Sequence, residues 1–129
     1  MDKTNVSKVF KNFNFVIDKS KSVRINDIVE SHFKKIKSGT FSTSFEVLLN
    51  NEKEFSLNKF SKIFELDNGR KNKIRRIKSV YKKGNNELQL IYSDTPKVEI
   101  EVSGEELDWS NELFVETEEQ LNAQRTILL

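Results

Sequence analysis

The chain has 129 residues, of which 33% are charged and 36% hydrophobic, with a formal net charge of +2 and no cysteine. This length and composition predict a soluble globular domain with its own core, and exclude a disulfide framework, a thiol nucleophile and a cysteine-ligated metal. No apolar run approaches the roughly 20 residues that a membrane span needs, and the start lacks the apolar stretch of a signal peptide, so we expect a cytoplasmic protein.

The N-terminal third is expected to be a pair of helices, residues 1–39. Its first segment spaces its apolar side chains as one face of an amphipathic helix does, namely Val6, Val9, Phe10, Phe13, Val16 and Ile17. A second helix is expected to begin near Asp27, with Glu30 three residues later completing a capping box, and to end at Gly39.

The middle of the chain changes to the period of a strand. Residues 41–49 alternate apolar and polar side chains, which predicts a half-buried strand. After a polar loop, Ser56 is placed to cap a short helix with Phe60 and Ile63 on its inner face. Three further strands joined by short turns favour an antiparallel meander; they are residues 74–82, 87–92 and 97–103.

The last helix is expected to begin at Ser110 as its N-cap. Trp109 and Phe114 then have the spacing of a hydrophobic staple, in which the residue before the cap packs on the first turn of the helix. This spacing favours a packing role for Trp109 over a role as a binding anchor.

These elements predict an α+β fold with the order α-α-β-α-β-β-β-α. We expect a single domain over residues 1–129, in which a β-α-β-β-β-α core, residues 40–129, forms a four-stranded, mainly antiparallel sheet with helices on one face.

Charge is segregated along the sequence. Eight bases and no acid lie between Arg70 and Lys83, whereas nine acids and no base lie between Glu99 and Glu119. The basic segment is a candidate polyanion-binding site through Arg70, Lys71, Lys73, Arg75, Arg76 and Lys78. The alternative is that Glu99 and Glu101 lie on the same outer face of the sheet and neutralise these bases within the molecule.

The sequence contains no pattern that predicts catalysis, a metal site or a cofactor. His32 is the only histidine and has no evident nucleophile or acid partner, so we expect it on the surface or boundary of its helix. The acids Glu105, Glu106 and Asp108 lack the alternating ligand spacing of a calcium loop. We therefore expect a protein that is not an enzyme, without a metal or cofactor.

The leading interpretation is a protein-interaction or oligomerisation domain of a bacterial or phage protein, either complete or as one module of a longer chain. Its interface is expected on the first helix, at Phe10, Phe13 and Phe15, because ten Phe exceed what one small sheet obviously needs. The partner would be another protein or a second copy of the chain. The alternative is a nucleic-acid or other polyanion binder that uses residues 70–83.

Overall fold

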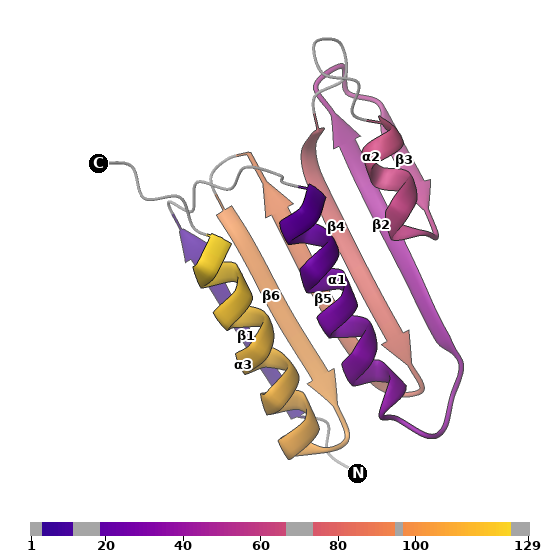
Figure 1. Cartoon of the computed structure of the whole chain (residues 1–129), viewed down its shortest axis with the longest axis vertical. Helices are drawn as coiled ribbons and strands as arrows, with labels where there is room; N and C mark the ends of the chain where they lie inside the picture. Colours follow the sequence, from indigo (N-terminus) through magenta and orange to yellow (C-terminus); the bar gives the residue numbers. More distant parts are fainter. Residues whose placement is uncertain (1–3, 12–18, 67–73, 95–96, 125–129) are drawn as a thin grey trace.

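The computed structural model describes residues 4–11, 19–66, 74–94 and 97–124. In these residues six strands and three α-helices follow one another, with one short 3-10 helix (Figure 1). Their bounds are β1 Thr4–Lys11, α1 Lys19–Lys34, β2 Phe41–Leu49, β3 Glu54–Leu57, η1 Phe60–Lys62, α2 Ile63–Leu66, β4 Ile74–Lys83, β5 Asn86–Ser93, β6 Lys97–Gly104 and α3 Leu107–Gln124.

The strands form one antiparallel sheet with the order β1-β6-β5-β4-β2-β3. The predicted meander is confirmed as β4, β5 and β6, which pair consecutively through short turns. The predicted strand of residues 41–49 is confirmed as β2, which pairs with β4 on one side and β3 on the other. The α+β class is therefore correct, but the described sheet has six strands rather than four.

The helices lie on one face of the sheet, as expected (Figure 1). Helix α3 covers β6 and β1, α1 crosses over the centre of the sheet, and α2 lies by β2 and β3. Alternate side chains of each central strand point under these helices, such as Tyr81, Leu88 and Ile100, which are all at most 2% exposed. The opposite face of the sheet has no helix on it in the described part of the chain.

The predicted first helix is wrong, because residues 4–11 form strand β1. β1 pairs with β6 so that Phe10 lies opposite Val98 and is buried under the helices. Val9, which the helical stripe had placed beside Phe10, points to the other face of the sheet and is 44% exposed. The pairing partner lies far along the chain, so local spacing alone does not reveal this strand.

Helix α1 begins at Lys19 rather than near Asp27. Asp27 and Glu30 therefore lie within the helix and do not form a capping box at its start. Val29 and Phe33 of this helix face the core, with exposed fractions of 0% and 1%.

The segment after β2 also differs from the prediction. Ser56 lies in strand β3 and does not cap a helix; the short helical stretch begins at Phe60 instead. Its expected inner residue Ile63 is fully buried. Strand β3 is only four residues long, and such a short edge strand carries little alternation to identify it.

Helix α3 begins at Leu107, so Ser110 is inside the helix and fully buried rather than at its N-cap. Trp109 and Phe114 are consequently not a hydrophobic staple. Both are nonetheless 8% exposed, which confirms that Trp109 packs in the core.

Candidate functional site

The outer face of the sheet carries the basic segment of β4. Strand pairing places Lys78 directly opposite Glu46 of β2 on one side and Ile91 of β5 on the other. Glu99 of β6 follows Ile91 in the same row, two strands from Lys78. Acids and bases therefore share this face of the sheet.

Ion pairs within the molecule reduce the basic character of β4 further. Arg75 Nε lies 3.2 Å from Asp94 Oδ2, and Lys82 Nζ lies 3.7 Å from Glu87 Oε1. Arg76 and Lys78 are only partly exposed. The remaining predicted polyanion contacts, Arg70, Lys71 and Lys73, lie outside the described residues.

Of the three residues of the predicted apolar interface, the structure describes Phe10. Phe10 is 6% exposed, and Lys8 Nζ lies 4.8 Å from its ring centroid. A buried ring under a cation does not serve as an exposed anchor. Phe13 and Phe15 lie outside the described residues.

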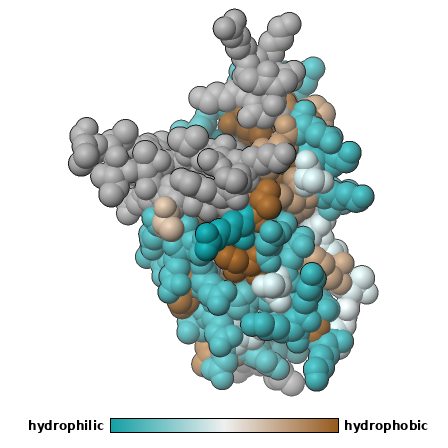
Figure 2. Space-filling model, in the orientation of Figure 1, coloured by the Kyte–Doolittle hydropathy of each residue, from teal (hydrophilic) through white to brown (hydrophobic). Residues whose placement is uncertain are grey.

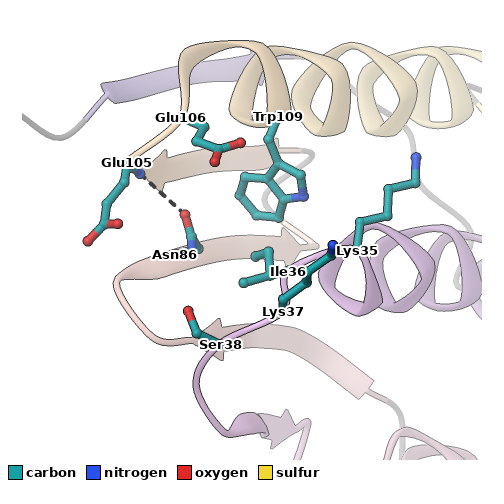
Figure 3. Close-up of a pocket in the computed structure, with 8 residues that line it drawn as sticks. All are labelled: Lys35, Ile36, Lys37, Ser38, Asn86, Glu105, Glu106 and Trp109. Carbon is teal, nitrogen blue, oxygen red and sulfur yellow. Dashed lines mark hydrogen bonds between the residues drawn. The ribbon is translucent and has the colours of Figure 1, made fainter.

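A polar pocket of about 350 Å³ lies where the end of α1, the β4–β5 turn and the start of α3 meet (Figure 3). Trp109 and Ile36 supply its apolar surface, and charged and polar side chains form the rest of its lining: Lys35, Lys37, Ser38, Asn86, Glu105 and Glu106. In Figure 3 the side chains of Lys35 and Glu105 point away from one another. Its charged groups therefore do not converge on one point.

The interface between α1 and α3 contains the only histidine. His32 is 2% exposed and its Nε2 lies 2.6 Å from Glu116 Oε2, so the expected surface position is wrong. Trp109 Nε1 donates a hydrogen bond of 2.9 Å to the His32 carbonyl oxygen. His32 Nδ1 is buried without a hydrogen-bond partner, whereas its Nε2 and its carbonyl oxygen both connect α1 to α3.

Exposed apolar side chains occur on the edge strand β1 and on α3, which covers it. The described residues include five large hydrophobic side chains with at least 36% exposure, and three of them belong to β1 or α3: Val9 at 44%, Leu107 at 65% and Val115 at 38%. Leu107, Val115 and Glu118 share one side of α3 by their spacing, and Glu118 Oε2 lies 2.8 Å from Lys8 Nζ of β1. This side of α3 therefore faces the edge strand.

Sequence reasoning missed this edge because it assigned β1 to a helix. The even spacing of Val6, Lys8 and Phe10 fits a strand, but the same segment also fits a helical stripe, so spacing does not decide between the two. Read as a strand, residues 4–11 place Val9 on the outer face.

The described residues form neither a metal cluster nor a membrane-spanning helix. They contain no cluster of three or more His, Asp or Glu side chains that could hold a metal ion. No helix among them has the length and apolar character required to cross a bilayer.

Comparison of the chain with protein-family models and with curated proteins gives no match. Three solved structures show weak likeness over nearly the whole chain. A conserved hypothetical protein from Pyrococcus furiosus is 15% identical, with a TM-score of 0.28, over 98% of this chain and 97% of that chain. A protein from Vibrio parahaemolyticus named provisionally as an adenylate cyclase is 10% identical, with a TM-score of 0.30, over 97% and 94%. A protein from Pyrococcus horikoshii is 12% identical, with a TM-score of 0.30, over 98% and 96%. Values of this size support no transfer of activity.

Proposed function

We propose that the chain is a non-enzymatic oligomerisation domain, which associates with a second copy through the edge formed by β1 and the adjoining side of α3. The observation that carries this proposal is that exposed apolar side chains lie on both sides of that edge: Val9 on the helix-free face of β1, and Leu107 and Val115 on α3. Exposed apolar side chains beside an edge strand are typical of a protein interface rather than of a solvated edge.

Strand β1 is suited to pairing with its own copy. It has eight residues, contains no proline, and among the described strands pairs with β6 alone. An antiparallel pair of β1 strands has two-fold symmetry, and a register centred on Ser7 places each Lys8 opposite Val6 of the second copy. A register centred on Lys8 would oppose two cations and is disfavoured.

The side of α3 that faces this edge adds to the same contact. Glu118 contacts Lys8, and Val115 lies one turn before it, so pairing around Ser7 brings the two α3 helices side by side near Val115. The acid Glu116 faces α1 instead, through its contact with His32. Repulsion between the acidic helices is thereby reduced at the proposed contact.

The test is the mass of the protein in solution, measured by sedimentation over a range of concentrations at low and high salt. We expect the mass to rise from 15.1 kDa toward twice that value. Val9→Lys combined with Val115→Glu should weaken the dimer by at least about tenfold, because it places charges on the paired strand and at the proposed contact between the two α3 helices. Phe55→Glu is the matched control, since Phe55 is 36% exposed on β3 at the opposite edge.

A monomer at every concentration would overturn the proposal. A monomer that carries nucleic acid at low salt and releases it at high salt would favour the alternative function, polyanion binding through residues 70–83, since such binding weakens steeply with salt. Circular dichroism of each variant establishes that its fold is retained.

A further inference from the structure

A second surface lies on the other flank of α1, away from the β1 edge. Here α1, β2 and the η1–α2 segment enclose a groove of about 390 Å³. One wall is polar and comes from α1, with Asn26, Asp27 and Glu30, while the other is aromatic, with Phe60 and Phe64. Figure 2, in the orientation of Figure 1, shows apolar colour beside polar colour in the region between α1 and α2.

The aromatic wall is fixed from behind. The rings of Phe60 and Phe64 lie edge to face with centroids 5.6 Å apart, and Phe60 contacts Phe45 in the same way at 5.7 Å. Phe45 is fully buried, whereas Phe60 and Phe64 remain partly exposed to the groove. The groove therefore has a rigid aromatic surface whose π faces or edges are available to a ligand.

The polar wall is fixed by a buried hydrogen-bond chain. The Tyr81 hydroxyl donates to Asn26 Oδ1 at 2.6 Å, and Asn26 Nδ2 donates to Glu30 Oε1 at 3.4 Å. Asn26 is 7% exposed, so this chain is largely shielded from water. Burial raises the pKa of Tyr81 well above its usual value, and electrostatic interactions with Tyr92, Glu30 and Asp27, in that order, raise it further. Tyr81 therefore stays protonated as a donor, and the two carboxylates lie near it.

We propose that this groove binds the arginine side chain of a partner peptide. The guanidinium group is the cation that matches both walls, because it pairs with carboxylates through several N–H groups and stacks on aromatic rings. Glu30 and Asp27 supply the carboxylates, and Phe60 and Phe64 the rings. Lys59 also lines the groove, but the two acids outnumber this single base.

The proposal is tested by nuclear magnetic resonance titration with the tripeptide acetyl-Gly-Arg-Gly-amide. The matched control ligand replaces arginine by citrulline, which has nearly the same shape but no charge. We expect amide signals around the groove to shift with the arginine peptide, and the citrulline peptide to bind at least about tenfold more weakly. Equal shifts from both peptides, or shifts confined to other surfaces, would overturn the proposal.

Variants of the protein separate the two walls. Glu30→Gln and Asp27→Asn should each weaken arginine binding by about fivefold to tenfold, because each removes one charge while retaining shape. Phe64→Leu should weaken it less, through lost stacking. Glu65→Gln is the control, since Glu65 is an exposed acid on α2 outside the groove. Unchanged affinity in both acid variants would overturn the proposal, and the dimer test at the β1 edge is independent of this result.

Discussion

Helix α1 has a neighbouring helical segment on each side, and the two contacts differ. On the α3 side, Trp109 packs edge to face on Phe33 at 5.1 Å and its ring nitrogen is bonded to the backbone of α1. On the α2 side, the helix and the aromatic wall leave the groove of about 390 Å³ between them. One flank is closed by a large side chain, and the other remains open.

The polar groups of α1 follow the same division. His32 finds its partner on another helix, Glu116, and the pair is part of a closed interface. Asn26 accepts a hydrogen bond from Tyr81 beneath it and donates one to Glu30, so this chain of hydrogen bonds connects α1 to strand β4 and not to α2. A closed flank contributes stability, whereas an open flank with satisfied but accessible carboxylates is available for binding.

The largest expected effect is at the closed flank. Trp109→Ala should lower the free energy of unfolding by about 3–5 kcal/mol, because it removes a buried aromatic side chain and its contact with Phe33. Phe64→Ala, on the open flank, should cost clearly less, since Phe64 is already partly exposed. Urea denaturation of both variants measures the difference, and equal losses would contradict the distinction between the flanks.

The two tyrosines beneath the helices determine how the stability of the fold should change at alkaline pH. Burial raises the pKa of both Tyr81 and Tyr92 above 10, and these are the two tyrosines of the chain. The unfolded chain releases their protons above about pH 10 while the folded protein retains them. Their contribution to stability is thus complete below about pH 10 and is lost as the pH rises.

The expected loss is about 1.4 kcal/mol per pH unit for each tyrosine, or about 2.7 kcal/mol for both, in the range above pH 10. Tyr81→Phe should halve the slope of the free energy of unfolding against pH. Urea denaturation at a series of alkaline pH values measures this slope. Tyrosinate absorbance should appear only as the protein unfolds. Tyrosinate formation near pH 10 in the folded protein would contradict this expectation.

Local patterns in the sequence predict the parts of the fold whose pairing partners are close along the chain. The meander of β4, β5 and β6 is correct because each strand pairs with the next through a short turn. The prediction of a helix for the residues of β1 is wrong. This strand pairs with β6 at the far end of the chain, and its Val6, Val9 and Phe10 also fit a helical stripe. The predicted starts of two helices are wrong because Asp27 and Ser110, residue types that often cap a helix, lie inside α1 and α3.

The candidate surfaces depend on such long-range contacts, which sequence spacing does not contain. The basic run of β4 appears continuous along the chain, yet strand order places Glu46 directly beside Lys78. His32 meets Glu116, and Asn26 meets Tyr81, across large separations in sequence. Neither contact can be predicted from residues that are close in sequence, so the closed and the open flank of α1 are identified only from the three-dimensional structure.

A smaller effect is expected from Glu116, which is 54% exposed but bonded to the buried His32. Glu116→Ala should cost about 1–3 kcal/mol, because it leaves a buried ring N–H without an acceptor. Glu116→Gln is the control. Its amide oxygen still accepts that hydrogen bond, so this variant should keep most of the free energy of unfolding that Glu116→Ala loses. Thermal or urea unfolding distinguishes the two, and an equal loss in both variants would show that the charge of Glu116 matters rather than the acceptor.

The smallest effect is expected on the opposite side of α3, where Glu118 pairs with Lys8 at 2.8 Å on an exposed surface, with side-chain exposures of 24% and 48%. A double-mutant cycle of Lys8→Met and Glu118→Gln in the monomer should give a coupling of about 0.2–1 kcal/mol that falls with added salt. At concentrations where the proposed dimer forms, a second β1 strand would shield this pair from water and the coupling should increase, because charge interactions strengthen as solvent is excluded. A coupling that stays the same as the dimer forms would indicate that the copies associate through another surface. Helix α3 would then bind the buried His32 of α1 through Glu116 and the exposed Lys8 of β1 through Glu118, and the Glu118–Lys8 pair would have no role in assembly.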